Sequence, residues 1–420
     1  MSNFVNRLYT LLAKNYSAIN IIGNRIASLA AQLAVLPILA KHLGVSGIGV
    51  WAYCQLIIQL AGTSIDMGYN ITGIKEVVNC NSDSKKVAEV YRAIQSNRAI
   101  FLLAGTSSIA VISINSPVDQ MLPILLTILA LVGIHLSPQW YFNGCRKIFV
   151  YTNTCTAFRI LSLACIFALH LANKITPTII YTLVFSGELC IGLFCHIYIS
   201  RTNSYIKPFK YFFEPNWGQF KKSLTAWTSS LSSIFVSFCT ALTIKYIGGF
   251  ESLGIYSAAE RVYKVAQSFL WPILQSYLPN IAARKSGFTA DNDNSHDMQK
   301  YFLAAIIGSI SIVLFFFSSE IIDTLYGSKF AASSAILKIF SIAFFAYSIN
   351  LIIQYYRYFS IGRNDIALKT AAMSAVILII MSILSAELIN INIAHNIVVA
   401  CELGVLIYLI TIAKVSKNEK

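Results

Sequence analysis

Residues 254–284 read GIYSAAERVYKVAQSFLWPILQSYLPNIAAR, a stretch apolar enough to enter a membrane that nevertheless carries charges. On a helix, Glu260 and Lys264 fall on one face because they are four residues apart. If the span enters near Leu253, Lys264 lies about 16 Å deep at 1.5 Å per residue, close to the middle of a hydrocarbon core about 30 Å thick. Charges at that depth usually face a water-filled cavity or a substrate path. The stretch therefore predicts a membrane helix beside a polar cavity.

The composition of the whole chain extends this prediction. Of the 420 residues, 56% are hydrophobic and 12% are charged, whereas a soluble domain has about 25% charged residues. Apolar runs of about 20 residues recur along the chain, which is typical of a polytopic all-α membrane protein. No long hydrophilic segment remains for a soluble domain.

The apolar runs predict twelve transmembrane helices. They divide into two pseudo-symmetric six-helix lobes, residues 1–205 and 206–420, around a central cavity. The predicted spans are residues 18–40, 47–70, 97–116, 120–142, 151–171, 177–198, 222–246, 253–282, 300–318, 330–356, 366–386 and 391–413.

Two segments of the chain repeat one another. KHLGVSGIGVWAYCQ (41–55) resembles KYIGGFESLGIYSAAE (245–260) when one residue is inserted. This alignment pairs Gly44 with Gly248, Gly49 with Gly254, Trp51 with Tyr256 and Gln55 with Glu260. A weaker echo pairs GELCIG (187–192) with CELGVL (401–406). Because six spans is an even number, the halves are expected to be parallel repeats with the substrate site between them.

Basic residues are unevenly divided between the two sets of connecting segments. One set is rich in lysine and arginine, for example Lys85, Lys86, Arg92, Arg98, Arg146, Lys147, Lys221 and Lys222. The other set holds only Lys41, Lys174 and Lys329. The positive-inside rule places the rich side and both termini in the cytoplasm. This asymmetry accounts for most of the net charge of +14, so a nucleic-acid partner is not expected.

No metal or catalytic motif stands out. The nine cysteines are scattered without a CxxC pair, and the six histidines have no ligand spacing, so neither a metal nor another cofactor is predicted. The longest outward segment, around residues 319–329, has only about a dozen residues, which leaves little room for an outer active site. The rings of Trp140, Tyr141 and Trp271 are read as core packing in preference to sugar stacking.

Eight ionisable residues within the spans are the candidate functional residues. Deep basic groups imply an anionic substrate, because arginine and lysine recognise phosphate oxygens. The candidate substrate-binding residues are Arg25, Arg159, Arg261 and Lys264. The candidates for ion coupling or gating are Asp66, Glu188, Glu260 and Glu402. Structural roles stay open for four of these residues. Arg25 could extend its side chain to the membrane–water interface, and Asp66 could form a hydrogen bond at a helix end. Glu188 and Glu402 could be protonated and hydrogen-bonded to neighbouring groups.

Four segments together resemble the Wzx-type O-antigen flippases of the MOP superfamily. They are PILAKHLGVSGIGVWAYCQ (37–55), IDMGYNITGIKEV (65–77), SPQWYFNGCRK (137–147) and GIYSAAERVYKVAQSFLWPILQSYLPNIA (254–282). The resemblance implies transport of an undecaprenyl-diphosphate-linked oligosaccharide across the bacterial inner membrane, from the cytoplasmic to the periplasmic leaflet. It also implies a proton or sodium gradient as the driving force, and the O-antigen polymerase and chain-length regulator as partners. Related lipid II flippases use arginines on the first and eighth spans, where Arg25, Arg261 and Lys264 lie here.

Two other functions remain open. A membrane-embedded polymerase or glycosyltransferase of the same pathway would also be polytopic, but such enzymes tend to carry a large outward loop. A multidrug exporter of the same superfamily would share the fold, but deep basic residues suit a cationic drug poorly. For the flippase, Pro272 and Pro279 are expected to bend their helix and so shape the inward cavity.

Overall fold

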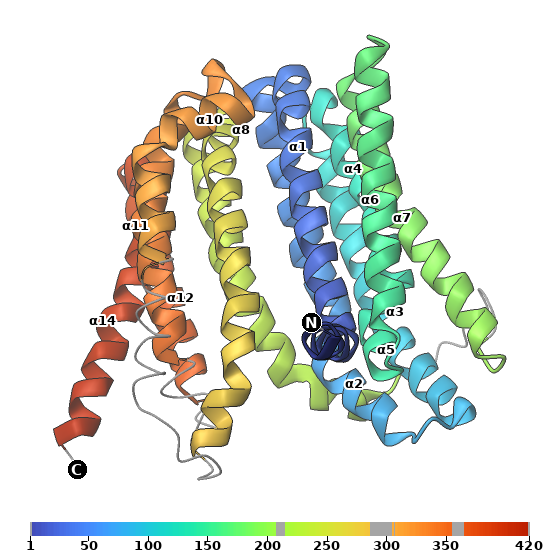
Figure 1. Ribbon diagram of the computed structural model, residues 1–420. Helices are drawn as coiled ribbons and strands as arrows, with labels where there is room; N and C mark the ends of the chain where they lie inside the picture. The colour runs from blue at the N-terminus through green and yellow to red at the C-terminus, as the bar shows by residue number, and fades with distance from the viewer. Residues whose placement is uncertain (1, 207–214, 286–304, 306, 355–364, 419–420) are drawn as a thin grey trace. The chain divides into compact units, whose positions relative to one another are not determined.

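The computed structural model describes the backbone of residues 2–206, 215–285, 305, 307–354 and 365–418. The side chains of residues 2–32, 229, 232–233, 269, 271–285, 365–368, 371 and 413–418 lie outside the described part. Every regular element in the described ranges is a helix, which confirms the all-α prediction. The helices are α1 Ser2–Asp66, α2 Tyr69–Asn79, α3 Ser84–Ile114, α4 Val118–Leu136, α5 Gln139–Gly144, α6 Ile148–Leu171, α7 Pro177–Thr202, α8 Trp217–Lys285, Ile307–Phe316, α10 Ser318–Tyr326, η1 Ser328–Phe330, α11 Ala332–Ile353, α12 Asp365–Glu387, α13 Ile391–His395 and α14 Ile397–Asn418 (Figure 1).

Several of these helices are long and apolar enough to cross a membrane. Within the described residues there are seven, or eight if the pair Ile307–Phe316 and Ser318–Tyr326, bent by 71°, is one span. Two shorter apolar helices are Ala372–Glu387 and Ile397–Ile412. The chain therefore has several membrane spans, and the total of twelve stays a prediction.

Helix α3 begins earlier than the hydropathy pattern indicates. The Asp83 carboxylate accepts hydrogen bonds from the backbone N–H groups of Lys85 (2.9 Å) and Lys86 (3.3 Å), so it satisfies donors that a helix start otherwise leaves unpaired. The segment predicted to connect two spans is instead the first part of this helix. Its apolar residues Tyr91 and Ile94 are completely buried.

The described chain forms two compact units. Unit 1 comprises residues Met1–His42 and Cys54–Leu231, and unit 2 comprises Leu43–Tyr53 and Ser232–Lys420. In unit 1, α3, α4, α6 and α7 run side by side (Figure 1). In unit 2, α14 packs against α11 and α12. The division of the chain into lobes at residues 205 and 206 stays a prediction.

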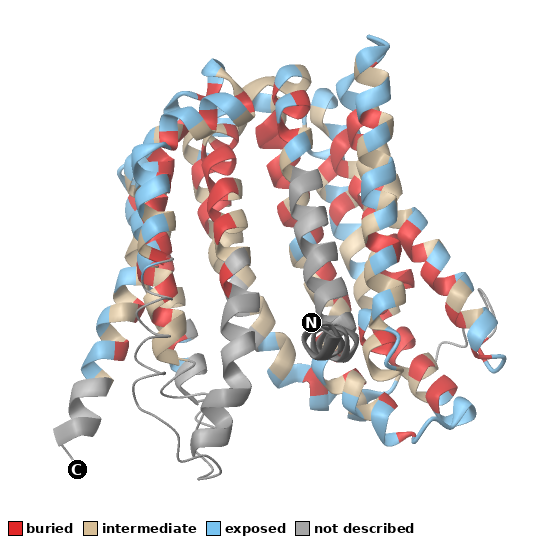
Figure 2. Cartoon of the chain, in the orientation of Figure 1, coloured by how far each residue is buried: buried red, intermediate tan, exposed pale blue. Residues whose placement is uncertain are grey.

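The core of unit 1 combines aromatic side chains with a close helix contact. Trp140 is completely buried and Tyr141 is 4% exposed, and both belong to the same cluster of buried hydrophobic residues, which confirms their packing role. Helices α4 and α7 approach backbone to backbone, because a Cβ atom on Gly133 would overlap the carbonyl group of Glu188. A Cβ atom on Gly192 would in turn lie 2.5 Å from the Gly133 oxygen. This contact fixes the position of Glu188 on α7 relative to Gly133 on α4. Figure 2 shows the buried residues of the described helices in red.

The kinks of α1 and α8 correct the register of the repeat. Gly44 (φ 67°, ψ −173°) and Gly249 (φ 68°, ψ −166°) adopt the same non-helical conformation, in the region that glycine enters without steric cost. They are 205 residues apart, as are Gly49 and Gly254. The pairing of Gly44 with Gly248 through an inserted residue was therefore wrong, because the equivalent kink is at Gly249 and no insertion is needed.

The two repeated segments contact each other reciprocally inside unit 2. A Cβ atom on Gly49 would overlap the carbonyl oxygen of Phe250, and a Cβ atom on Gly254 would overlap that of Val45. Each glycine thus packs on the residue that lies four positions before its own counterpart. Such a backbone contact needs small residues, and it gives the two segments a local pseudo-twofold relation.

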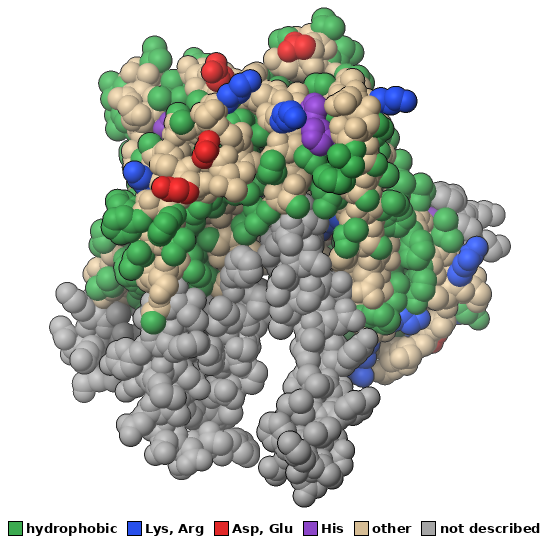
Figure 3. All heavy atoms as spheres, turned by 45° about the horizontal axis from the view of Figure 1, so that its top comes forward, with side chains coloured by type: hydrophobic (Ala, Val, Ile, Leu, Met, Phe, Trp, Pro, Cys, Tyr) green, Lys and Arg blue, Asp and Glu red, His purple; other side chains and the backbone are tan. Residues whose placement is uncertain are grey.

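Large apolar side chains remain exposed on the helices. Leu103 is 63% exposed, Phe316 70% and Ile380 58%. In Figure 3, apolar side chains cover much of the surface of the described helices. Soluble proteins rarely expose continuous apolar surfaces of this kind, whereas helices in a bilayer do.

Candidate functional site

In unit 1, two of the candidate residues form an ion pair. An Nη2 atom of Arg159 on α6 lies 3.4 Å from Oε1 of Glu188 on α7. Their side chains are 43% and 31% exposed. The structure thus joins a predicted substrate-binding residue to a predicted coupling residue. Both charged side chains are therefore only partly buried by the protein.

In unit 2, a second pair lies within one helix. Nζ of Lys264 lies 2.8 Å from Oε1 of Glu260, one turn earlier on α8. The lysine side chain is 41% exposed and the glutamate 12%. The helical spacing thus brings these two residues together as the sequence predicts. Arg261, the next residue on α8, interacts electrostatically with Tyr326 of α10.

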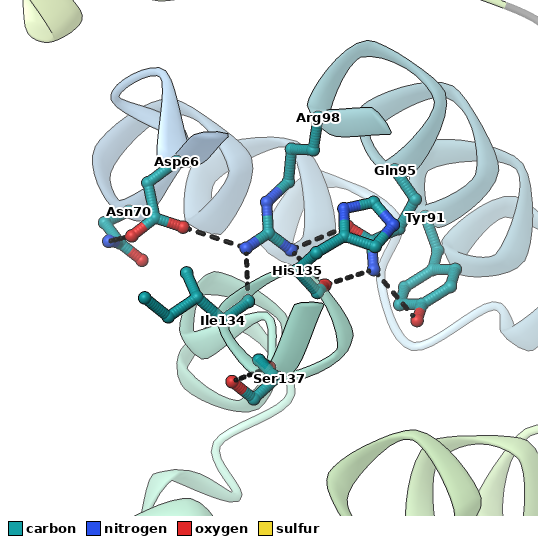
Figure 4. A network of polar contacts seen from close by, with 9 residues as sticks. Asp66, Asn70, Tyr91, Gln95, Arg98, Ile134, His135 and Ser137 are labelled. Carbon is teal, nitrogen blue, oxygen red and sulfur yellow. Dashed lines mark hydrogen bonds and ion pairs between the residues drawn. The ribbon is translucent and has the colours of Figure 1, made fainter. Parts of the chain in front are cut away.

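Asp66, the remaining acidic candidate of unit 1, belongs to a buried network centred on Arg98 (Figure 4). Arg98 is completely buried and donates from Nη2 to Asp66 Oδ1 (3.0 Å) and to the Ile134 carbonyl (2.8 Å). From Nη1 it donates to Gln95 Oε1 (2.6 Å) and to the His135 carbonyl (2.9 Å). The two carbonyls belong to the last turn of α4, where helix oxygens lack intrahelical partners and a cation is favoured.

This network corrects the assignment of Arg98 to a basic connecting segment. Arg98 lies well inside α3 and ties together the ends of α1 and α4. The sequence contained a signal for this, because an N-cap at Asp83 would have started the helix at Ser84 and placed Arg98 fourteen residues inside it. Asp66 is further held by Asn70, whose Nδ2 donates to Oδ2 (3.2 Å). Both contacts favour the helix-end role of Asp66 that the sequence left open.

Glu402 on α14 has a neutral partner. Nδ2 of Asn350 on α11 donates to Glu402 Oε2 (3.0 Å) and to the Glu402 carbonyl (2.9 Å). Asn350 is 2% exposed. The hydropathy pattern did not single out Asn350, because one amide within an apolar helix leaves the pattern of a membrane span unchanged.

Four residues singled out in the sequence have side chains that lie outside the described part of the chain. The backbone of Arg25 lies within α1, but its side chain lies outside the described part. The same holds for the side chains of Trp271, Pro272 and Pro279 in α8. Across the described residues, no group of three or more His, Cys, Asp or Glu residues is arranged to hold a metal ion.

Comparisons with known proteins place the chain in a family. Residues 14–285 match the family model described as "Polysaccharide biosynthesis protein", which is more than half of the chain. A comparison with curated protein sequences finds no significant match.

Solved structures show the same fold at low sequence identity. The lipid II flippase MurJ in an inward closed conformation matches with a TM-score of 0.68 and 17% identity, over 94% of this chain and 87% of that one. An inward-facing MATE multidrug resistance transporter matches with a TM-score of 0.65 and 12% identity, over 94% and 96%. A MOP superfamily transporter from Pyrococcus furiosus matches with a TM-score of 0.56 and 9% identity, over 93% of each chain. The chain therefore belongs to the polysaccharide biosynthesis protein family and has the fold of the MOP superfamily transporters.

Proposed function

We propose that this protein is a flippase that moves an undecaprenyl-diphosphate-linked O-antigen repeat unit from the cytoplasmic to the periplasmic leaflet of the inner membrane. The cycle is alternating access, coupled to an ion gradient. Both termini lie in the cytoplasm. The observation that carries the proposal is the polysaccharide biosynthesis family match on a transporter fold.

The two charged pairs can bind a diphosphate if it replaces the carboxylate in each pair. Lys264 is paired with Glu260, and Arg159 with Glu188, so neither cation is left uncompensated in a low-dielectric environment. A diphosphate offers several strong acceptor oxygens that can replace the carboxylate. Return of the carboxylate to its cation then favours release of the substrate. The half-exposed lysine and arginine are suited to such an exchange of partners.

A deletion strain tests the proposed function. It is expected to lose surface O-antigen and to accumulate single lipid-linked repeat units that face the cytoplasm. Accumulation of unpolymerised units in the periplasm would instead identify a polymerase. Normal O-antigen together with increased drug sensitivity would identify a multidrug exporter.

Removing the lysine charge is expected to impair transport. Complementation with Lys264→Ala should lower O-antigen display by roughly tenfold or more, the effect of losing about 1.4 kcal/mol of binding free energy. Lys264→Arg should retain part of the activity, because it keeps the positive charge. Display is measured on surface polysaccharide, normalised to the amount of protein in the membrane.

The matched control is Lys329→Ala. Lys329 is an exposed residue of η1, and its loss should leave display unchanged. Normal display with Lys264→Ala at wild-type protein level would contradict a role of this lysine in substrate binding.

A further inference from the structure

Two glutamates that the repeat places in corresponding positions have different partners. Glu188 of GELCIG faces the guanidinium of Arg159, whereas Glu402 of CELGVL faces the amide of Asn350. In the described part of the chain, no lysine, arginine or histidine forms an ion pair with Glu402. A carboxylate next to a guanidinium is stabilised in its charged form, whereas an amide imposes no charge. The two sites are therefore chemically distinct despite their similar sequences.

The geometry of Asn350 defines its donor and acceptor sides. A side-chain amide has two N–H donors on nitrogen and two acceptor positions on oxygen. Nδ2 makes two contacts, with Oε2 and with the backbone oxygen of Glu402, which orients the amide with its nitrogen toward α14. Oδ1 is buried and has no hydrogen-bond partner among the described residues. An unused buried acceptor costs free energy, so this oxygen is available for a donor that the present state does not supply.

Other polar groups near Glu402 come from α8 and α11 and from α14 itself. Tyr263 of α8 interacts electrostatically with Glu402, with Tyr347 of α11 and with Glu260. Its hydroxyl oxygen also accepts a hydrogen bond from Nε2 of Gln267 (2.7 Å). Next to Glu402 on α14 lies the buried Cys401, whose Sγ donates to the carbonyl of Ser374 on α12 (3.5 Å). Tyr263 therefore stands in electrostatic contact both with Glu402 and with the carboxylate that pairs with Lys264.

We propose that Glu402 and Asn350 form the proton-carrying site of the transport cycle, an inference that rests on the proposed flippase function. In one half of the cycle the carboxylate takes up a proton from water, an O–H bond forms, and the group becomes a neutral carboxylic acid. In the other half that bond breaks and the proton returns to water on the other side of the membrane, with nothing oxidised or reduced.

Asparagine suits both protonation states. Its N–H groups donate to the carboxylate, and after a turn of the amide its Oδ1 accepts the O–H of the acid. An arginine at this position has donors only and could serve the charged form alone. Glu188, held by Arg159, therefore stays charged through the cycle and belongs to substrate exchange. A divalent cation such as calcium or magnesium is the poorer occupant, because it takes about six or more oxygen ligands, whereas the contacts described here supply the Glu402 carboxylate, the Glu402 backbone oxygen and the Asn350 amide oxygen.

Protonation can be measured without any substrate. The full-length protein is reconstituted in lipid vesicles, and infrared difference spectra are recorded as the pH is changed. A band of a protonated carboxyl group is expected to titrate in the wild type, to disappear in Glu402→Gln and to persist in Glu188→Gln. Asn350→Leu should shift the midpoint of this band to higher pH by about one unit, because it removes donors to the carboxylate. Glu402→Asp should restore a titrating band, and thermal unfolding of each variant verifies its folding.

Transport supplies the second measurement. In cells, a protonophore should reduce O-antigen display by the wild type, and Glu402→Gln should show low display that the protonophore no longer changes. Glu320→Gln, an exposed position of α10, is the control and should behave as wild type. Loss of the band in Glu188→Gln but not in Glu402→Gln, or dependence of transport on sodium instead of pH, would overturn the proposal. If the band assigns to Glu402 while the deletion strain displays normal O-antigen, the proton site stands and the flippase function fails.

Discussion

Arg98→Ala is expected to lower the free energy of unfolding by about 3 kcal/mol, the lower end of the range for removing one partner of a buried ion pair, because the Arg98 side chain is completely buried whereas that of Asp66 is 31% exposed. The change leaves Asp66 without its cation and removes the donors to the Ile134 and His135 carbonyls at the end of α4. Since α1, α3 and α4 all lose a contact, unit 1 should loosen as a whole. Unfolding of the purified protein in detergent micelles, followed by tryptophan fluorescence, measures the effect.

A neighbouring arginine provides the control. Arg92 lies on the same helix, and its side chain bonds only to the carbonyl of Ala88 (3.3 Å) among the contacts described. Arg92→Ala should cost about 1 kcal/mol or less, in the range for partly exposed contacts. Arg98→Lys should remain destabilising, because an ammonium group cannot reproduce the contacts of the guanidinium fork. Equal stability of the Arg92 and Arg98 variants would contradict the structural role of the network.

The second large effect is expected at the helix crossing of the repeat. Gly254→Ala should cost about 3 kcal/mol, at the upper end of the range for overpacking, because the new methyl group meets the backbone carbonyl of Val45 and not a flexible side chain. Gly49→Ala should cost a similar amount, since its contact with Phe250 is the reciprocal one. The same unfolding measurement in micelles compares the two variants.

Gly308→Ala is the matched control for these glycines. A Cβ atom at Gly308 meets nothing within 4 Å, so this substitution should be neutral or slightly stabilising, as alanine generally is in a helix. A large effect at Gly254 with none at Gly49 would contradict the reciprocal packing. A large effect at Gly308 would mean that the loss of any helical glycine is harmful here.

Local sequence signals were sufficient for the helices and for the internal pairs. Apolar runs long enough to span a bilayer predicted the helical elements, because every backbone polar group must be satisfied within such a segment. The spacing of four residues brought Glu260 and Lys264 together, since this is a property of any helix. The repetition of residues 41–55 was also visible in the sequence, although its register was off by one residue.

Other features depended on tertiary contacts. The hydropathy pattern put Arg98 at the very start of the span 97–116, beside the basic connecting segment. Its burial depends on Asp66 of α1 and on carbonyl groups of α4, which are distant in the sequence. The register of the repeat was decided by the positive φ angles of Gly44 and Gly249. The sequence does not reveal which of the adjacent residues Gly248 and Gly249 adopts this conformation. The partners of Glu188 and Glu402 likewise came from another helix.

The sequence by itself therefore determined the all-α membrane class of the protein, the presence of several membrane helices and the proximity of Glu260 and Lys264. These properties follow from hydrophobicity and helical spacing, both of which are local. The tertiary structure alone decided that Arg98 is a structural cation and that Glu188 faces a guanidinium while Glu402 faces an amide. Burial and pairing of a charge depend on groups distant in the chain, and only the packing of the helices brings those groups together.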